Sequence, residues 1–217
     1  MKPHYIHKLI IQGEHQQLDF KFEIADSRKI ARTFSAFANT NGGKLLIGVM
    51  DNGNISGIRT EEEKFMAEKA VNQYCKPLIE FRIKEWIVEG KKVLEITIKP
   101  GIEKPYYALD VNGKWLAYVR VNDQNVLAHK IMVNAWIRRG KPEGTYINYS
   151  QNEKLLLEYL EENKFITISR FKELAGLSAH KAEIILTNFL ALDIIEIELT
   201  EQEVFFRLSD KFQESGS

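Results

Sequence analysis

The sequence predicts an α+β protein in which a mixed sheet with packed helices is followed by a small C-terminal domain made largely of helices. In the first two thirds of the chain, apolar residues occur both in alternation and in short continuous runs, which is typical of strands mixed with helices. Gly140, Pro142 and Gly144 then interrupt the pattern, and a strongly helical sequence follows. We therefore predict two domains, residues 1–148 and residues 149–217.

Bulk composition indicates an ordinary folded protein. The 217 residues are 44% hydrophobic, which is enough to bury a sizeable core. Apolar runs fall far short of the roughly 18 to 20 residues of a membrane span, and the N-terminus has no apolar signal core, so we expect a cytoplasmic protein with no membrane partner. The one cysteine, Cys75, excludes an internal disulfide and a cysteine-cluster metal site. We expect this thiol to be buried and inert.

The charges are distributed unevenly, although the formal net charge is zero. Residues 1–149 contain 23 Lys and Arg against 17 Asp and Glu, and the remaining residues contain 7 against 13. A positive balance favours contact with anionic partners such as nucleic acid, whereas a negative balance disfavours it. The first domain is therefore the better candidate for binding nucleic acid.

The first strand is predicted over residues 17–24, QLDFKFEI, where apolar and polar side chains alternate. Asp19 and Lys21 then lie on its polar face. A helix follows, with Asp26 or Ser27 as its N-cap. Its apolar residues fall at helical spacing, which predicts firm packing on a sheet: Ile30, Ala31, Phe34, Phe37 and Ala38.

The turn Asn41-Gly42-Gly43 is predicted to join this helix to a buried strand, KLLIGV, because glycine supplies the left-handed backbone that ends helices. Gly43-Lys44 superficially resembles the end of a Walker phosphate loop. That motif needs an earlier glycine, a following hydroxyl and the order strand, loop, helix. Here the order is helix, turn, strand, and Leu45 follows the lysine, so we do not expect ATP hydrolysis at this turn.

The rest of the first domain is predicted as a hairpin connection, a helix, two strands joined at Gly90, a further strand and a short helix. In that order their ranges are residues 50–58, 61–75, 81–89, 91–100, 114–121 and 125–137.

The second domain is predicted as three helices and a hairpin, which is the order of a winged helix-turn-helix domain. Gly176 falls at the turn between the second and third helices. We expect a serine to cap the second helix and Ser178 to cap the third. The predicted ranges are residues 152–164, 166–177 and 178–193 for the helices and 194–208 for the two strands.

Three segments resemble the Schlafen-type AlbA-like domain: LDFKFE, FSAFANTNGGKLLIGVMDNGNISGI and KPYYALDVNGKWLAYVRVNDQNVLA. The resemblance covers roughly residues 12–130. It implies a DNA-binding domain of the kind that often precedes a winged helix in prokaryotic transcriptional regulators. From it we expect a transcriptional regulator that forms a homodimer, binds DNA rather than RNA and needs no cofactor.

The resemblance also implies an enzymatic alternative, because some animal Schlafen proteins cleave tRNA and rRNA with three acidic residues and a divalent metal ion. The matching residues here are Glu14, Asp19 and Asp51, which would hold Mg²⁺ or Mn²⁺. Asp19 departs from the glutamate usual in the family. Glu14 would face the other side of a regular strand unless a bend at residues 13–17 brings it round. The simpler interpretation, which we favour, is a solvated strand face with Lys21 and an ordinary turn.

Nucleic-acid contacts are expected from basic side chains near the signature and at the start of the third C-terminal helix: Lys21, Arg28, Lys29, Arg32, Lys44, Arg120 and Lys181. Those on the helix after Asp26 would contact phosphates without base specificity. Tyr106, Tyr107 and Tyr118 offer stacking surfaces, although aromatic residues that alternate along strands are more often core residues.

A third alternative is a non-catalytic protein-interaction module with a dimerising winged helix. The predicted hairpin is acidic and would repel phosphates, its acidic residues being Glu196, Glu198, Glu201 and Glu203. Phe205 and Phe206 on its edge strand are expected to be exposed, which would suit protein contacts.

Overall fold

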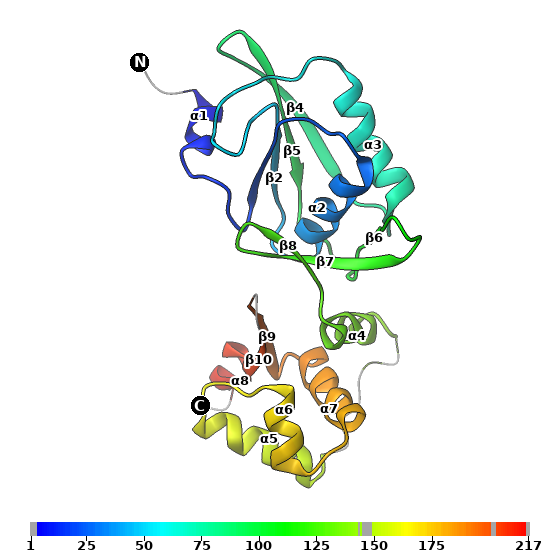
Figure 1. The fold of residues 1–217 in the computed structure, drawn as a ribbon. Helices are drawn as coiled ribbons and strands as arrows, with labels where there is room; N and C mark the ends of the chain where they lie inside the picture. Colours follow the sequence, from blue (N-terminus) through cyan, green and yellow to red (C-terminus); the bar gives the residue numbers. More distant parts are fainter. Residues whose placement is uncertain (1–3, 143, 145–148, 201–202, 216–217) are drawn as a thin grey trace. The chain divides into compact units, whose positions relative to one another are not determined.

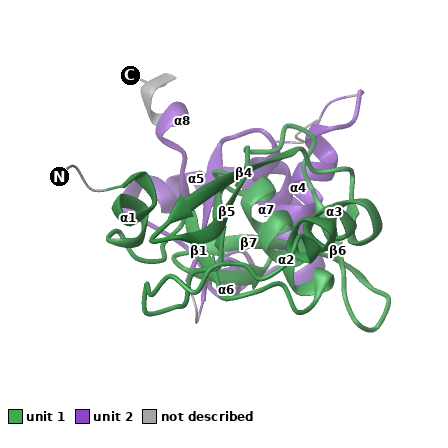
Figure 2. Cartoon of the chain, turned by 90° about the horizontal axis from the view of Figure 1, so that it is seen from above, with its two compact units in different colours: residues 1–128 green, residues 129–217 purple. Residues whose placement is uncertain are grey.

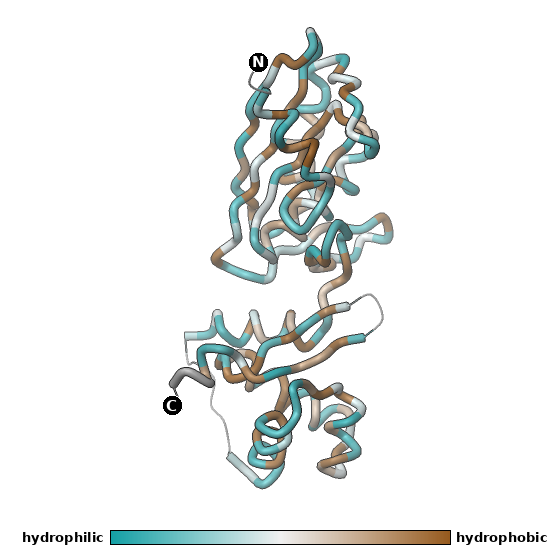
Figure 3. Tube along the Cα trace, turned by 90° about the vertical axis from the view of Figure 1, so that its left-hand side faces the viewer, coloured by the Kyte–Doolittle hydropathy of each residue, from teal (hydrophilic) through white to brown (hydrophobic). Residues whose placement is uncertain are grey.

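The chain divides into two compact units, Met1–Ala128 and His129–Ser217, which Figure 2 colours separately. Each unit has its own cluster of buried apolar residues, and polar and apolar stretches alternate along the trace of both (Figure 3). Within the described ranges, no helix has the length and apolar character needed to cross a membrane. The structure, a computed structural model, describes residues 4–142, 144, 149–200 and 203–215.

The first unit contains two four-stranded sheets and the helices that pack on them, which confirms the predicted α+β class with a mixed sheet. One sheet has the order β1-β2-β5-β4, in which β1 is parallel to β2 and the other neighbours are antiparallel. The second sheet, β3-β6-β7-β8, is antiparallel. The helices are α1 (Tyr5–Ile10), α2 (Ser27–Asn39) and α3 (Glu62–Tyr74). The strands are β1 (Leu18–Lys21), β2 (Gly43–Ile47), β3 (Cys75–Lys76), β4 (Phe81–Val88), β5 (Lys91–Ile98), β6 (Tyr107–Leu109), β7 (Trp115–Val121) and β8 (Gln124–Leu127).

Helix α2 lies between the two sheets and is buried along most of its length (Figure 1). Asp26 is the N-cap, as predicted, and its side chain accepts a hydrogen bond from the Arg28 amide at 2.8 Å. The helix ends before Gly42, whose φ of +70° is the left-handed conformation that favours glycine. A Cβ at Gly42 would also lie 2.6 Å from the Ile98 carbonyl oxygen, so this turn needs glycine for space as well.

Polar side chains fasten α2 to the second sheet. Asn39 Nδ2 donates to the carbonyls of Tyr106 (2.7 Å) and Tyr118 (2.9 Å), and Asn39 Oδ1 accepts from the Tyr106 amide at 2.8 Å. Ser35 Oγ donates to the Tyr106 carbonyl and accepts from the Tyr118 amide. Both tyrosines are 8% exposed, so the core interpretation holds for them. Buried polar groups need partners, and these bonds supply them.

The first strand is covered on both faces. Its apolar residues Leu18 and Phe20 pack under α1, while Asp19, in register with the core residue Leu45, faces α2. Asp19 is only 3% exposed, so the predicted solvated strand face is wrong for this residue. The alternation of residues 17–24 predicted one buried face, and it could not show that a second layer covers the other.

Two predicted elements of the first unit differ from the structure. Residues 50–58 form a turn with one isolated bridge between Val49 and Ile55 rather than a two-stranded hairpin. The short helix predicted over residues 125–137 begins only at Lys130, because Gln124–Leu127 pair with β7 as strand β8. Both cases depend on pairing between segments that are close in the sequence: Val49 bridges Ile55, and β8 pairs with β7 across the two-residue turn at 122–123.

The second unit follows the predicted order of three helices and a hairpin, with a further helix at each end. Ser178 caps α7 as predicted, whereas Thr167 rather than a serine caps α6. Gly176 has φ +61° at the turn between them. The elements are α4 (Lys130–Arg139), α5 (Gln151–Glu162), α6 (Ile168–Ala175), α7 (Ala179–Ala191), β9 (Ile195–Leu199), β10 (Val204–Leu208) and α8 (Asp210–Ser215).

Helix α4 packs within the second unit, so the compact units divide earlier than the boundary predicted near residue 148, which itself lies outside the described residues. Arg139 Nε donates to the Ala191 carbonyl at the C-terminus of α7, at 3.0 Å. Lys130 pairs with Glu183 of α7 at 2.5 Å. Because α4 is basic, the charge asymmetry between the units is smaller than the one between the predicted domains. The first unit holds 19 Lys and Arg against 16 Asp and Glu, and the second holds 11 against 14.

Candidate nucleic-acid interface

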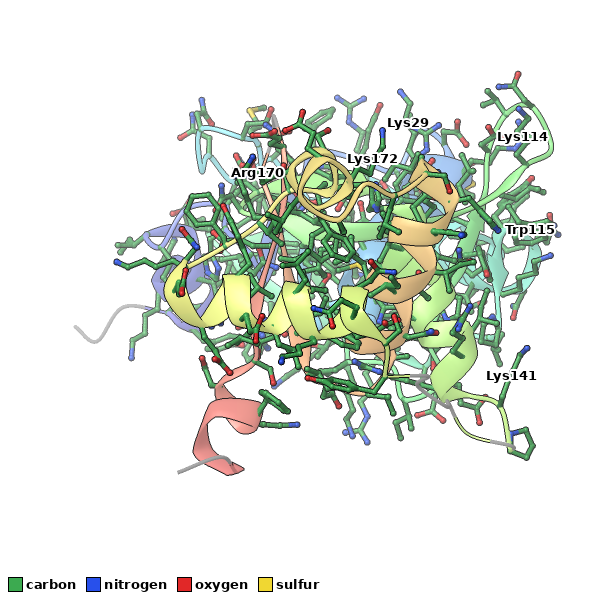
Figure 4. The ribbon with its side chains drawn as sticks, turned by 90° about the horizontal axis from the view of Figure 1, so that it is seen from below. Lys29, Lys114, Trp115, Lys141, Arg170 and Lys172 are labelled. Carbon is green, nitrogen blue, oxygen red and sulfur yellow. The ribbon has the colours of Figure 1, made fainter. Side chains whose placement is uncertain are left out.

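The exposed edge of α2 carries three basic residues, Arg28, Lys29 and Arg32, which we call the α2 edge. Lys29 is exposed and is labelled in Figure 4. The Arg28 guanidinium lies 5.2 Å from the ring centroid of Tyr74, and that of Arg32 lies 5.7 Å from the ring of Tyr118. Stacking on a ring holds a guanidinium in place and leaves its N–H edges available to acceptors.

The α2 edge is not neutralised by acidic side chains. Among the ion pairs between described residues, none includes Arg28, Lys29 or Arg32. Arg28 and Arg32 stand one helical turn apart, so their side chains share a face. The predicted placement of these residues on the outer part of the helix is therefore correct for Lys29 and holds for the half-exposed arginines.

Two other lysines of the first unit, Lys64 and Lys92, are paired with acidic side chains. Lys64 and Lys92 both contact Glu61, at 2.5 Å each, and both also contact Glu85. Hydrogen bonds from Lys64 and Lys92 lower the pKa of Glu61 to about 2. The α2 edge differs from this pair of lysines, whose charges are met by Glu61 and Glu85.

Lys44 is also paired. Its ammonium donates to the Tyr5 hydroxyl at 2.9 Å and to the carboxylate of Glu95, which is 4% exposed. Glu95 also accepts from Tyr5 at 2.9 Å and from Trp86 Nε1 at 2.8 Å. Burial alone would raise the pKa of Glu95, but these donors outweigh burial and lower it. Glu95 therefore offsets the charge that Lys44 would offer to a phosphate.

Arg120 is buried, with 1% of its side chain exposed. Its Nη1 donates to Asn125 Oδ1 and its Nη2 to the His15 carbonyl, both at 3.1 Å, and Nη1 lies 3.7 Å from Asp19 Oδ2. The prediction that Arg120 contacts nucleic acid is wrong for this structure. The side chain instead ties β7 to the segment before β1.

Glu14 and Asp19 come together at the start of β1. Gly13 has φ +70°, and the chain turns at His15 to Leu18, which supplies the bend that the prediction required. Lys21 Nζ lies 3.0 Å from Asp19 Oδ1 and 3.8 Å from Glu14 Oε1, so these three side chains lie close together. Burial, and then the neighbouring Asp19 carboxylate, raise the pKa of Glu14 to about 7.

Asp51 does not complete a metal site with this pair. It is exposed in the turn that follows β2. Across the described part of the chain, no three His, Cys, Asp or Glu side chains gather into a group that could hold a metal ion. The residues therefore do not fit the three-carboxylate centre that the resemblance to nucleases implied.

In the second unit, Lys181 is exposed at the start of α7, where its amide donates to the N-cap Ser178 Oγ at 3.3 Å. Further along α7, Asn188 accepts a hydrogen bond from Arg138 of α4. Helix α6 adds two basic residues that the sequence analysis did not single out, Arg170 and Lys172, both labelled in Figure 4. Lys181 is the one Lys or Arg of α7 and lies in its first turn, while α4 engages Glu183 and Asn188 further along the helix.

The aromatic pair of the hairpin differs from prediction. Phe206 is fully buried, and Phe205 is half-buried with its ring 4.9 Å from that of Phe165. Phe206 therefore belongs to the core, and Phe205 lies at the surface beside Phe165, which is 54% exposed. Of the predicted acidic residues, Glu196 pairs with Arg207 at 2.6 Å, and Glu201 lies outside the described residues.

Basic and aromatic side chains also meet in two pairs that the sequence analysis did not single out. Lys84 Nζ lies 3.8 Å from the ring centroid of Trp86 on β4, and Lys76 Nζ lies 4.1 Å from the ring of Trp115. Alternation along FRIKEWIV could have revealed the first pair, because Lys84 and Trp86 are two residues apart and so share a face. The second pair joins distant segments and leaves no local signal.

A family model described as Schlafen, AlbA_2 matches residues 14–129. The crystal structure of the DIP2311 protein from Corynebacterium diphtheriae is similar at 19% identity and TM-score 0.45, over 66% of this chain and 34% of that chain. This chain therefore spans about a third of that protein's length. The N-terminal domain of an ATP-dependent DNA helicase RecG-related protein from Nitrosomonas europaea is similar at 18% identity and TM-score 0.40, over 59% and 97%. No curated protein matches the chain. Likenesses this distant say nothing about function.

Proposed function

Because the chain belongs to the Schlafen AlbA_2 family, we propose that its first unit binds nucleic acid through the α2 edge. The observation that carries the proposal is the row of basic side chains without acidic partners among the described residues, two of which are held on tyrosine rings. Side chains of this kind bind phosphate oxygens, which gives affinity that depends on salt and little on base sequence.

We propose further that the chain is a transcriptional regulator, that DNA is its partner and that it acts in the cytoplasm as a homodimer. The support is the family and the element order α5-α6-α7-β9-β10, which is the order of a winged helix. In this proposal α7 contributes only its first turn, with His180 and Lys181, because α4 holds the rest. Phosphate contacts from the α2 edge then supply most of the affinity.

The test is an equilibrium titration of the full chain with labelled duplex DNA, single-stranded DNA and RNA. Three phosphate contacts predict a slope near −2.7 for the logarithm of affinity against the logarithm of salt concentration, or about a 40-fold loss between about 50 and 200 mM salt. Lys29→Glu should weaken binding by about five-fold or more. Lys164→Glu, which changes the same charge on an exposed residue of the second unit, is the matched control. Binding that is insensitive to Lys29→Glu would contradict the proposed interface.

A further inference from the structure

The face of the first sheet that points away from α2 is covered only in part. The register places side chains of β4, β5, β2 and β1 on this face in rows, because alternate residues of paired strands share a face. Helix α1 packs over the apolar end of these rows, where Ile6 contacts the cluster of Leu18, Phe20 and Leu46 (Figure 1). The six residues of α1 are too few to reach the rest of the sheet.

The uncovered part is a trough lined by basic, hydroxyl and aromatic side chains. One cavity of about 680 Å³ adjoins a second of about 330 Å³, and Lys44 and Thr97 line both. We call this surface the outer trough and define it by Tyr5, Lys44, Arg82, Lys84, Trp86, Thr97 and Lys99.

The aromatic wall of the outer trough, formed by the rings of Tyr5 and Trp86, is held in place by a buried carboxylate. The buried carboxylate of Glu95 accepts hydrogen bonds from the Tyr5 hydroxyl and from Trp86 Nε1. The two rings are thereby held with centroids 4.9 Å apart and planes tilted by 33°. Glu95 also pairs with Lys44, so its own charge is offset. A preorganised aromatic surface loses little conformational entropy when a planar group stacks on it.

The charge of the outer trough is set by residues other than Lys44. Arg82, Lys84 and Lys99 are exposed, and none of them enters an ion pair with another described residue. Lys84 Nζ rests over the ring of Trp86, where cation and ring attract each other. Basic side chains therefore flank the aromatic wall and extend beyond Lys44 to Lys99 in the second cavity.

We propose that the outer trough binds a single-stranded segment of nucleic acid. Unpaired bases stack on the aromatic wall, and phosphates pair with Arg82, Lys84 and Lys99, in the manner of surfaces that combine a basic groove with aromatic platforms. Duplexes hide the faces of their bases, so a duplex cannot use the wall. When a base stacks on Trp86, the ammonium of Lys84 leaves the ring and pairs with a phosphate. This inference rests on the proposed nucleic-acid function and assigns single strands to a second surface.

The test measures quenching of tryptophan fluorescence and anisotropy while the full chain is titrated with oligothymidine, oligouridine and a duplex of the same length. Arg82→Glu combined with Lys84→Glu should weaken single-strand binding by about ten-fold or more and leave duplex binding within two-fold. Trp86→Phe keeps a stacking ring and should lose less than Trp86→Leu. Lys91→Glu, an exposed lysine at the other end of the same sheet, is the control. Thermal unfolding of each variant checks that the first unit remains folded.

Each outcome separates this inference from the proposed function. Single-strand affinity that stays within two-fold in the Arg82→Glu, Lys84→Glu variant overturns the inference, while weaker duplex binding by Lys29→Glu still supports the α2 edge. Loss of single-strand binding in the trough variant, with no effect of Lys29→Glu, supports the trough and overturns the α2 edge. Wild-type protein that binds no nucleic acid overturns both. Binding of polyglutamate that depends on Arg82 and is not displaced by oligothymidine overturns the inference in favour of an acidic peptide.

Discussion

Helices α2 and α7 both contain 13 residues and both begin at a side-chain N-cap, yet their polar surfaces have different surroundings. The α2 edge has no acidic partner among the described residues, whereas α4 lies along α7 and engages it. Lys130 pairs with Glu183, and Arg138 donates to Asn188. The comparison teaches that a polar helix face is available to a ligand only where no neighbouring element occupies it, and that helical pattern alone does not decide this.

The largest expected effect concerns the buried side of α2. Asn39→Ala removes the hydrogen bonds of Asn39 to the Tyr118 carbonyl and the Tyr106 amide, which stay buried, while the Tyr106 carbonyl keeps its bond from Ser35 Oγ. Leaving such groups unsatisfied should lower the free energy of unfolding of the first unit by about 4 kcal/mol. Urea unfolding followed by hydrogen exchange in α2 measures the loss. Asn41→Ala, two residues on at an exposed position, should change it by less than about 0.5 kcal/mol.

The next effect concerns the hold of α4 on α7. Arg139→Ala removes the donor to the Ala191 carbonyl and the ion pair with Asp193, which spans 2.5 Å. We expect the free energy of unfolding of the second unit to fall by about 1 to 2 kcal/mol, with faster hydrogen exchange in the last turn of α7. Lys141→Ala, an exposed residue just after α4, is the control. Unchanged exchange in α7 would show that α4 does not hold this helix.

The two helices should also differ in how much they contribute to DNA binding. Lys29→Glu on α2 should weaken duplex DNA binding by about 1 kcal/mol, while Lys181→Glu on α7 should change it by less than half as much. Both residues are exposed, so the pair is matched in residue type and accessibility. Equal losses from the two changes would mean that α7 reads DNA as fully as the α2 edge does.

The smallest effect concerns the Glu14 carboxyl. Its pKa in the folded chain is about 7, above the ordinary 4.5, so between these pH values the folded state binds more protons than the unfolded state. Stability from this group is present below about pH 4.5 and is lost as the pH rises through about 7. Glu14→Gln keeps an acceptor for the Phe20 amide but removes the titrating carboxyl, so the free energy of unfolding should fall by about 1 kcal/mol less as the pH rises. The difference is small because the side chain is partly exposed and solvent screens its charge. Urea unfolding at pH 5 and at pH 8 compares the two proteins. An equal decline in both would show that Glu14 does not set it.

Local signals predicted much of this fold. Each of these signals depends on residues only a few positions apart. They are the N-caps Asp26 and Ser178, the left-handed Gly176 and the alternation along β4 and β5. The α2 edge was predictable for the same reason, since helical spacing places Arg28 and Arg32 on one side. Elements of this kind depend on backbone preference and amphipathic pattern, which the sequence displays directly.

The differences arise where partners come from distant parts of the chain. Asp19 is buried because its strand is covered on both faces, and Arg120 is buried between β7 and the segment before β1, where Asn125 Oδ1 and the His15 carbonyl accept from its Nη atoms. Strand β8 is a local case: it pairs with β7 across the turn at 122–123 and takes the place of the first residues of the helix predicted over 125–137. Helix α4 joined the second unit through α7. The contacts of Asp19, Arg120 and α4 with distant segments leave no periodic signal, so alternation and composition alone could not predict them.

The most direct test of the central claim is the salt dependence of duplex DNA binding by the wild-type chain and by an Arg28→Gln, Lys29→Gln, Arg32→Gln variant. These changes remove charge from the α2 edge while keeping side chains of similar length. The account predicts that the variant's slope is shallower by about 2 to 3 units, one for each lost phosphate contact. A variant that binds with the wild-type slope and affinity would contradict it.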